Sequence, residues 1–319
     1  MNIMSKILVT GGAGFIGSHL VDKLLSMNEK VIVLDNLSSG NMKNIKHNEG
    51  NPNFEVVVGD LLKPEDIEKC LNDVEKVYHL AANPDVKIGA EDSRVHFDQN
   101  IVATYNLLEA MRKKGIKNII FTSTSAVYGD ATQIPTKEDY GPLIPISLYA
   151  ASKLAAEALI SSYCYTFDMK SVLLRFANVI GERSGHGVIF DFIKKLKQNP
   201  KELEILGDGT QSKSYLYIDD CIDGMIFSEK NAKNRVEIFN LGSEDRITVK
   251  EIADLVVKGL GLENIEYKFT GGVDGGRGWK GDVKYMLLSI DKIKQLGWKP
   301  KYNSKESVEK TIEILKKLF

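Results

Sequence analysis

The sequence predicts an α/β protein whose core is a parallel, doubly wound sheet. The first observation is that short apolar segments, each ended by turn residues, alternate with helical patterns. The second is a glycine-rich turn, Gly11 to Gly17, placed directly between the first apolar segment and the first helical pattern. In the first half of the chain the expected strands span 6–10, 30–34, 54–58, 74–80 and 117–122.

The remaining elements follow the same alternation. The helical pattern after Gly17 runs to Leu25, and the one at 64–71 opens with acidic residues, which suit the positive end of a helix. Further along the chain, we expect helices at 100–114, 147–167, 188–198, 249–259 and 304–317, and strands at 170–175 and 203–206.

The composition is that of an ordinary globular protein. Among 319 residues, 42 Lys and Arg balance 43 Asp and Glu, which argues against nucleic acid as a partner. The cysteines, Cys70, Cys164 and Cys221, lack metal-ligand spacing, so we expect reduced thiols and no metal site. No charged-then-apolar leader opens the chain, and no apolar run reaches about 18 residues. These features predict a cytoplasmic protein that does not enter a membrane.

The glycine-rich turn predicts a dinucleotide site. Gly11, Gly14 and Gly17 have the spacing for a tight turn, a close backbone approach to a pyrophosphate, and close packing of helix on strand. Asp35 ends the second strand, where a carboxylate binds the ribose hydroxyls of an adenosine. No arginine follows it in residues 36–40, and a carboxylate repels a 2′-phosphate, so we expect NAD rather than NADP.

Polar and small residues follow the next three strands, at the sheet edge where ligands of this fold class bind. Asp60 follows the third strand, where it could accept a hydrogen bond from an adenine amino group, although a turn residue needs no such role. Ala81 and Ala82 follow the fourth strand and leave room for a ligand near the backbone. A cluster of hydroxyl groups, Thr122 to Ser125, follows the fifth.

The segment from Leu148 to Leu159 carries the residues expected to do chemistry. It is rich in Ala and Leu, which favours a helix, and Ser147 is a suitable N-cap. Tyr149 and Lys153 are four residues apart and therefore lie on one helix face. A nearby cation favours the phenolate form of a tyrosine, so the pair is a candidate general base near neutral pH.

Together these motifs resemble the extended short-chain dehydrogenase/reductase superfamily, and within it the NAD-dependent nucleotide-sugar epimerases typified by UDP-glucose 4-epimerase, the archaeal ones above all. The resemblance covers essentially the whole chain. The motifs that carry it are Thr10-Gly-Gly-Ala-Gly-Phe-Ile-Gly17, Asp35-Asn-Leu-Ser-Ser-Gly40, Gly59-Asp60, His79-Leu-Ala-Ala82, Thr122-Ser-Thr-Ser-Ala-Val-Tyr-Gly129, Tyr149-x-x-x-Lys153, Arg175-Phe-Ala-Asn-Val-Ile-Gly181, Leu206-Gly-Asp-Gly-Thr-Gln211, Tyr217-Ile-Asp-Asp220, Phe239-Asn-Leu-Gly242 and Leu296-Gly-Trp-Lys-Pro300.

The resemblance implies an isomerase that interconverts UDP-galactose and UDP-glucose through a transient 4-keto sugar. Tyr149 would take the proton from the sugar 4-hydroxyl while NAD takes the hydride from C4. Lys153 would hydrogen-bond the nicotinamide ribose and lower the pKa of Tyr149, assisted by the positive nicotinamide ring. Thr124 would bridge the sugar oxygen and the tyrosine. The hydride would then return to the other face of the sugar.

The residues after Thr124 distinguish this reaction from others in the superfamily. In the 4,6-dehydratases an Asp-Glu pair stands there, because elimination needs an acid and a base, and relatives that make UDP-xylose tend to have a Glu at the first position. Ser125 and Ala126 occupy these positions here, which favours epimerisation. The alternatives are another nucleotide-sugar epimerase, acting on a UDP-N-acetylhexosamine or UDP-glucuronate, a reductase of the same fold, and a catalytically silent dinucleotide sensor.

The resemblance also implies two sets of binding residues. The predicted NAD-binding residues, besides Tyr149 and Lys153, are Gly11, Gly14, Phe15, Ile16, Gly17, Asp35, Asn36, Ser38, Ser39, Gly40, Asp60, Leu61, Leu80, Ala81, Ala82, Asn100, Thr122 and Phe176. The predicted substrate-binding residues are Lys87, Ser123, Thr124, Asn178, Val188, Lys213, Tyr215, Arg277 and Asp282.

Two departures from the family pattern leave the diphosphate ligand open. Lys213 stands where the family often has an arginine, and lysine lacks the bidentate fork. Trp279-Lys-Gly-Asp282 replaces the usual Arg-Pro-Gly-Asp, so Arg277 or Lys280 would supply the missing cation. Met286 lies near a position that limits whether an N-acetylated sugar fits, and a flexible methionine leaves that question open.

The expected organisation is a Rossmann-type NAD-binding domain over residues 1–178 and about 217–242, with a smaller nucleotide-sugar-binding α/β domain over 179–216 and 243–319. The resemblance further implies a homodimer formed through the long helices at 100–114 and 147–167.

Overall fold

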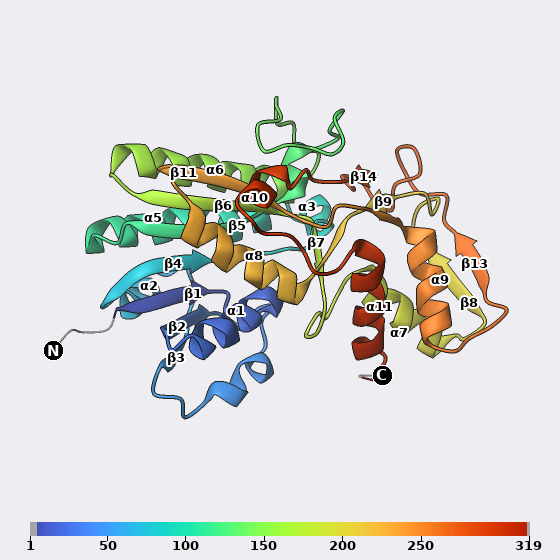
Figure 1. The fold of residues 1–319 in the computed structure, drawn as a ribbon, viewed down its shortest axis with the longest axis horizontal. Helices are drawn as coiled ribbons and strands as arrows, with labels where there is room; N and C mark the ends of the chain where they lie inside the picture. Colours follow the sequence, from blue (N-terminus) through green and yellow to red (C-terminus); the bar gives the residue numbers. More distant parts are fainter. Residues whose placement is uncertain (1–4, 318–319) are drawn as a thin grey trace. The chain divides into compact units, whose positions relative to one another are not determined.

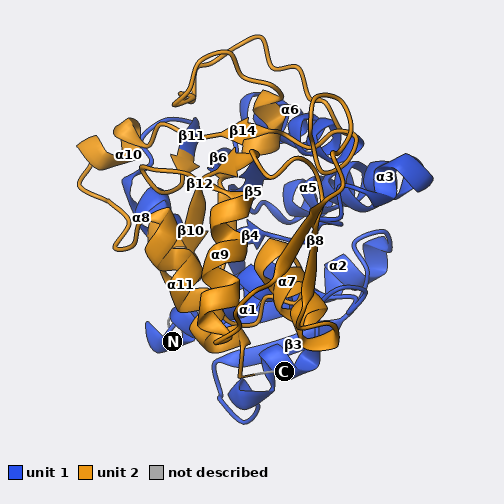
Figure 2. Ribbon diagram, turned by 90° about the vertical axis from the view of Figure 1, so that its right-hand side faces the viewer, with its two compact units in different colours: residues 1–124, 148–175, 225–239 blue, residues 125–147, 176–224, 240–319 orange. Residues whose placement is uncertain are grey.

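The structure, a computed structural model, describes residues 5–317 (Figure 1). By its internal contacts the chain divides into two compact units (Figure 2). Unit 1 contains the residues up to 124, 148–175 and 225–239, and unit 2 contains 125–147, 176–224 and the residues from 240 on. Unit 2 thus includes residues 125–147, which were predicted to belong to the NAD-binding domain. The predicted domain boundaries stay a prediction.

Unit 1 is built on a seven-stranded sheet with the strand order β11-β6-β5-β4-β1-β2-β3. The pairs β1–β2, β1–β4, β2–β3 and β4–β5 are parallel. Because the strand order reverses at β1, the carboxyl ends of β1 and β4 form the crevice in which this fold class binds ligands. The predicted fold class is therefore confirmed. The strands are β1 (Lys6–Thr10), β2 (Lys30–Asp35), β3 (Phe54–Val58), β4 (Val74–His79), β5 (Asn118–Thr124), β6 (Lys170–Phe176) and β11 (Val236–Leu241).

The helices of unit 1 pack their apolar sides on the sheet and on one another. Leu107 from α5, Phe121 from β5 and Ile160 from α6 belong to one core cluster and are at most 1% exposed. The helical elements are α1 (Phe15–Ser26), η1 (Met42–Asn44), η2 (Lys46–Asn48), α2 (Pro64–Cys70), α3 (Ile88–Glu91), α4 (Arg94–His96), η3 (Phe97–Val102), α5 (Ala103–Lys114) and α6 (Leu148–Thr166). α8 (Ile218–Asn231) begins in unit 2 and ends in unit 1.

The helix predicted at 100–114 begins differently from the expectation. Its first part is the π-helical segment η3 (Phe97–Val102), which leads without a break into α5. π-helical turns are rare and are often found at functional sites. The buried amide of Asn100 lies in this segment and makes the hydrogen bonds described below. α5 ends at Gly115, whose φ of +73° is the left-handed conformation that glycine adopts without strain.

Unit 2 consists of short paired strands and helices. α7 (Val188–Gln198), α9 (Val249–Gly259) and α11 (Ser304–Leu315) share a core cluster, in which Ile193, Val256 and Val308 are fully buried. Capping boxes begin α9 at Thr248 and α11 at Asn303. The other elements are η4 (Ser125–Tyr128), β7 (Asn178–Ile180), β8 (Glu202–Ile205), β9 (Ser212–Lys213), β10 (Tyr215–Tyr217), β12 (Ile247–Thr248), β13 (Glu266–Phe269), β14 (Tyr285–Met286) and α10 (Asp291–Gln295).

Within residues 5–317, no helix has the length and apolar character needed to span a membrane. The same residues contain no group of three or more His, Cys, Asp or Glu placed to hold a metal ion.

Candidate active site

The glycine-rich turn has the close contacts that its spacing predicts. Gly11 has a φ of +71°, and a Cβ there would lie 2.7 Å from the backbone nitrogen of Ala81. A Cβ on Gly17 would lie 2.1 Å from the carbonyl oxygen of Gly11. α1 begins just after Gly14, which makes no side-chain cap bond. The backbone N–H groups at this helix start and the room left by the glycines fit the pyrophosphate of a dinucleotide.

The carboxylate of Asp35 is fixed next to this turn. It is 8% exposed, and it accepts hydrogen bonds from the backbone N–H groups of Ala13 (2.9 Å) and Leu37 (2.8 Å). Burial raises the pKa of Asp35, while the two N–H groups lower it. A Cβ on Gly40 would lie 2.8 Å from a carboxylate oxygen of Asp35, so glycine keeps this space open. The site therefore holds an acidic group where the ribose of an adenosine was predicted to bind.

The predicted residues around Asp35 differ in exposure. Asn36 is exposed and donates to the Asp60 carboxylate at 3.2 Å, and Asp60 also accepts from the backbone N–H of Leu62 at 2.9 Å. Leu61 is buried, whereas Ser38 and Ser39 are exposed. Whether Asp60 contacts an adenine stays a prediction.

A chain of buried hydrogen bonds supports the carboxyl ends of β1 and β4. The hydroxyl of Thr10 lies 2.8 Å from Nδ1 of His79, and Nε2 of His79 lies 2.9 Å from the hydroxyl of Thr104. Burial lowers the pKa of His79 to about 3, so its ring is neutral at physiological pH. Thr10 also accepts from the backbone N–H of Ala81 at 3.3 Å, which ties the β4 end to β1.

Asn100 uses its amide within the protein. Its oxygen accepts from the backbone N–H of Asn83 (2.7 Å), and its amide nitrogen donates to the hydroxyl of Ser152 on α6 (2.9 Å) and to the carbonyl of Asn83 (3.3 Å). Asn100 thus connects the segment after β4 to the helix that carries Tyr149. Its predicted contact with NAD stays a prediction.

Lys153 is buried at the carboxyl end of β5. It is 3% exposed, its ammonium donates to the carbonyl of Thr122 at 2.7 Å, and it lies 4.5 Å from the centre of the Phe121 ring. Burial lowers the pKa of Lys153 to about 7, and the charge of Glu157 acts in the opposite direction. The ammonium therefore contacts neutral groups, and the charge of Glu157 stabilises it without a direct contact in the described part of the chain.

Tyr149 lies one turn before Lys153 and is half-buried. Its phenol makes a hydrogen bond with the side chain of Thr124, and the ring of His96 packs edge-on at 5.7 Å between centres. Burial raises the pKa of Tyr149 to about 12, although the bond from Thr124 lowers it. For the chain alone, burial is thus the larger influence on this pKa. That Tyr149 and Lys153 act as a general base near neutral pH stays a prediction.

Ser123 does not have a free hydroxyl in this structure. The Ser123 hydroxyl is buried and donates to the carboxylate of Glu157 at 2.5 Å. Glu157 also accepts two hydrogen bonds from the guanidinium of Arg175. The sequence reasoning did not single out Glu157, although its position four residues after Lys153 was the available signal. The predicted contact between Ser123 and a substrate stays a prediction.

In unit 2, the cations predicted to bind a diphosphate are held by acidic groups. Lys213 pairs with Asp282 at 2.5 Å and lies 5.5 Å from the centre of the Trp279 indole. Arg277 makes a two-pronged contact with Asp130, at 3.0 and 2.8 Å, and also donates to the carbonyl of Asp282 at 2.5 Å. The structure thus brings together Lys213, Arg277 and Asp282, three of the predicted substrate residues.

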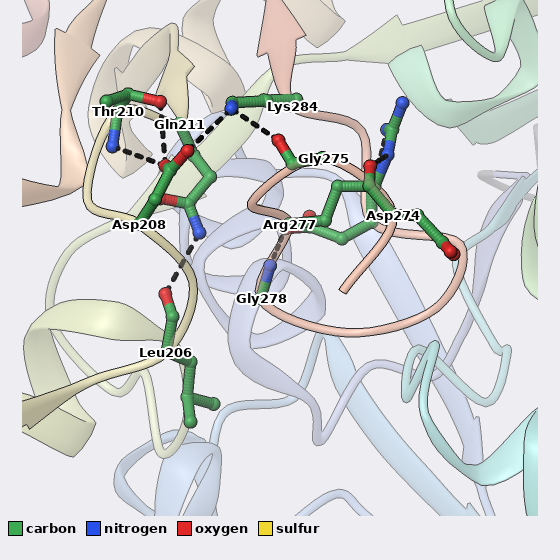
Figure 3. Close-up of polar contacts among 10 residues, drawn as sticks. Leu206, Asp208, Thr210, Gln211, Asp274, Gly275, Arg277, Gly278 and Lys284 are labelled. Carbon is green, nitrogen blue, oxygen red and sulfur yellow. Dashed lines mark hydrogen bonds and ion pairs between the residues drawn. The ribbon is translucent and has the colours of Figure 1, made fainter. Parts of the chain in front are cut away.

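A pocket of about 450 Å³ opens next to this cluster within unit 2 and is lined by Asp130, Arg277 and Lys284, among others. Figure 3 shows polar contacts around two of the lining residues, Arg277 and Lys284. Lys284 donates to Asp208 (2.8 Å) and to the carbonyl of Gly275 (2.6 Å), and Thr210 donates to Asp208. Charged groups of both signs therefore line the pocket.

The remaining predicted substrate residues are more scattered. Tyr215 is buried, and burial raises the pKa of its phenol. Asn178 and Val188 are half-buried at the starts of β7 and α7, whereas Lys87 is exposed before α3. Phe176, predicted to contact NAD, is buried at the end of β6, Met286 is buried in β14, and Lys280 is exposed. Their contacts with ligands stay predictions.

Comparison with known proteins assigns the chain to a family. The model of the NAD dependent epimerase/dehydratase family matches residues 7–242. A Methanocaldococcus jannaschii protein, provisionally named UDP-glucose 4-epimerase, is 38% identical over 97% of this chain and 98% of its own length. The crystal structure of a UDP-galactose 4-epimerase is 41% identical and has a TM-score of 0.87, covering 98% of this chain and 99% of that one.

A relative with a different name is also similar. UDP-glucuronic acid decarboxylase 1 of Arabidopsis thaliana is 33% identical over 96% of this chain and 69% of its own length. The superfamily predicted from the motifs is confirmed by these similarities, and NAD is the cofactor of the matched family, as predicted. The chain belongs to the NAD dependent epimerase/dehydratase family.

Proposed function

We propose that the protein is an NAD-dependent UDP-glucose 4-epimerase that interconverts UDP-galactose and UDP-glucose through a transient 4-keto sugar. The observation that carries the proposal is the contact of Thr124 with the Tyr149 phenol, one helical turn before the buried Lys153. The named relatives support the same activity, since a M. jannaschii protein and a crystal structure with epimerase names cover nearly the whole chain.

In the proposed reaction, Tyr149 accepts the proton of the sugar 4-hydroxyl and Thr124 passes it by bridging the sugar oxygen and the phenol. NAD, when bound, supplies the hydride acceptor for C4 and a positive charge near the phenol. The ammonium of Lys153 supplies a second positive charge on the same helix face. Because burial raises the pKa of Tyr149 to about 12 in the chain alone, we expect positive charge near the phenol to assist its activation.

The residues that follow Thr124 argue against the other reactions of the family. Ser125 and Ala126 offer no carboxylic acid and no strong base, so elimination of water lacks its two proton-transfer groups. A reaction that oxidises and re-reduces one carbon needs only the groups already described. Epimerisation at C4 is such a reaction.

The binding residues of the proposal are those predicted from the sequence. The glycine turn and Asp35 would hold the adenosine and the pyrophosphate of NAD. Lys213 and Arg277 would contact the diphosphate of the sugar nucleotide, which requires the diphosphate to compete with Asp282 and Asp130 for these cations. Lys213 and Arg277 stand as the replacement for the arginines that the family pattern leads one to expect.

The first experiment uses the protein as purified. We expect it to convert UDP-galactose to UDP-glucose without added cofactor, and to release NAD on denaturation. Conversion measured by chromatography of the nucleotide sugars would support the proposal. Bound NAD without conversion of any UDP-hexose would contradict the epimerase activity and leave the family assignment intact.

A second candidate is a 4-epimerase for a UDP-N-acetylhexosamine or for UDP-glucuronate. The similarity to a UDP-glucuronic acid decarboxylase supports this second candidate. Met286, which is 7% exposed, lies near the position that the family pattern connects with the size of the sugar. The same assay with UDP-N-acetylglucosamine and UDP-glucuronate in place of UDP-galactose separates the two. A kcat/KM for either of these sugars above that for UDP-galactose would replace the first candidate by the second.

The proposal includes a homodimer and a cytoplasmic location. Large apolar side chains are exposed on the helices expected to form the dimer, Tyr105 on α5 (47% exposed) and Tyr165 on α6 (67%). Phe97 (52%) lies three residues before the first of these predicted helices. Exposed apolar side chains on neighbouring helices often mark an interface. Light scattering should give twice the mass of one chain, and Tyr105→Glu should reduce it to that of a monomer.

The three buried cysteines, all free thiols, suit a reducing compartment such as the cytoplasm.

A further inference from the structure

α6 carries a third charged group in line with Tyr149 and Lys153. Glu157 lies four residues after Lys153, as Lys153 lies four after Tyr149, so the three share one helix face. The Glu157 side chain is buried, with 4% exposure. The proposed reaction gives this carboxylate no part, yet a buried charge is costly unless other groups hold it.

The Glu157 carboxylate is held from two strands of the sheet. Arg175 on β6 donates from Nε to one oxygen at 3.0 Å and from Nη2 to the other at 2.7 Å. The hydroxyl of Ser123 on β5 donates to the first of these oxygens at 2.5 Å. A two-pronged, charge-assisted contact fixes the plane of a carboxylate as well as its position. Glu157 therefore keeps one orientation, on the helix face that also carries Tyr149 and Lys153.

The ammonium of Lys153 needs such a group. Its two described contacts, the carbonyl of Thr122 and the ring of Phe121, are both neutral. Burial among neutral groups favours the uncharged amine, and burial brings the pKa of Lys153 down to about 7. The charge of Glu157 acts against this loss of the proton.

The other titratable groups around this helix face do not supply a negative charge. His79 on β4 is neutral, because burial lowers its pKa to about 3. Tyr149, with a pKa of about 12, keeps its proton at neutral pH. Burial lowers the pKa of His96 on α4, and a histidine carries no negative charge in either form. Arg175 on β6 is a cation, and its contact is with Glu157. Among residues 5–317, Glu157 is the acidic group whose charge acts on Lys153.

We propose that Glu157 is a positioning residue of the active site: held by Arg175 and Ser123, its carboxylate keeps the buried ammonium of Lys153 charged, one helical turn from Tyr149. The catalytic consequence of this inference rests on the proposed function. The charge state of Lys153 does not, since it can be measured without a substrate.

The first experiment titrates Lys153 by NMR of protein labelled with 13C at the lysine Cε, with the Lys153→Met spectrum assigning the signal. Glu157→Gln, which keeps the shape and removes the charge, should lower the midpoint of the titration by about one pH unit. Glu157→Asp, which keeps the charge and shortens the side chain, should leave the midpoint near that of the wild type. An unchanged midpoint in Glu157→Gln, or equal shifts in both variants, would overturn the proposal.

Two further variants keep this test decisive. Glu157→Gln leaves Arg175 without its anion, so the double variant Glu157→Gln/Arg175→Met removes both buried charges and protects folding. It should also lower the midpoint. Glu237→Gln is the control, because Glu237 is a buried carboxylate on β11 of the same sheet that accepts from the backbone N–H groups of Lys233 and Asn234. It should not move the midpoint.

The second readout is the pH profile of UDP-galactose conversion. In Glu157→Gln, kcat at pH 7.5 should fall by about tenfold with KM changed less than twofold, and the loss should shrink as the pH is lowered and Lys153 regains its proton. A loss that is independent of pH would indicate a structural role alone. If the wild-type protein converts no UDP-hexose, the proposed function fails, while the NMR titration still decides the role of Glu157.

Discussion

Two lysines of this protein lie in opposite electrostatic surroundings. Lys153 in unit 1 is 3% exposed and contacts a carbonyl and an aromatic ring, with its nearest anion already paired to Arg175. Lys213 in unit 2 makes a direct ion pair with Asp282, itself 4% exposed, and keeps some contact with solvent. The first cation is poorly compensated, and the second is compensated by a partner of its own.

The difference shows what each cation is suited to do. A poorly compensated charge is costly to the fold but stabilises a new negative charge nearby, which a tyrosine that acts as a base requires. A cation in an ion pair contributes to stability, and it can bind an anionic ligand only by sharing or exchanging its partner. The same substitution at the two positions should therefore have opposite effects on stability.

The largest effect is expected for substitution of Tyr149, the proposed general base near Lys153. Tyr149→Phe removes the proposed base and keeps the ring that packs against His96. We expect kcat to fall by roughly 10³- to 10⁴-fold, because the loss of a general base costs about this much. NAD released on denaturation should be unchanged. Turnover within tenfold of the wild type would show that another group takes the proton.

Lys153→Met tests the cost of the poorly compensated cation. We expect kcat to fall by at least about 10²-fold, since the phenolate loses its neighbouring charge. We also expect the free energy of unfolding at pH 7 to rise by about 1–4 kcal/mol, because a buried charge is replaced by an apolar side chain of similar length. Urea unfolding of the NAD-free protein measures this. A loss of stability would mean that Lys153 is better compensated than its contacts indicate.

Lys213→Met is the matched substitution in unit 2. We expect the free energy of unfolding to fall by about 3 kcal/mol, because the buried carboxylate of Asp282 loses its ion pair. The double variant Lys213→Met/Asp282→Leu should recover most of this loss. If both lysine variants shift urea unfolding in the same direction, the contrast between the two sites is wrong.

The last prediction concerns how the stability gain of Lys153→Met depends on pH. In the folded chain Lys153 has a pKa of about 7, against an ordinary value of 10.5, so the unfolded chain binds the extra proton between these values. Wild-type stability relative to the variant therefore rises with pH over this window. The gain of Lys153→Met should be largest below pH 7 and shrink toward pH 10. A gain that is constant from pH 6 to 10 would contradict the lowered pKa.

The fold class, the family and the features that lie within single elements could be predicted from the amino-acid sequence. The alternation of strands and helices, the glycines after β1 and Asp35 at the end of β2 all follow from local patterns. Tyr149 and Lys153 share a helix face because four residues make about one turn. Such features depend only on the fixed period of a helix or strand, and they were predictable for that reason.

Long-range packing sets which side chains contact one another and how far each is removed from solvent. Ser123 bonds to Glu157, 34 residues away, and Arg277 pairs with Asp130, 147 residues away. Asn100 lies in a π-helical segment that the helical pattern did not reveal. The direction of the Tyr149 pKa shift also depends on packing, because burial raises this pKa more than the hydrogen bond with Thr124 lowers it. Partners and desolvation depend on segments far apart in the chain, and no local period records them.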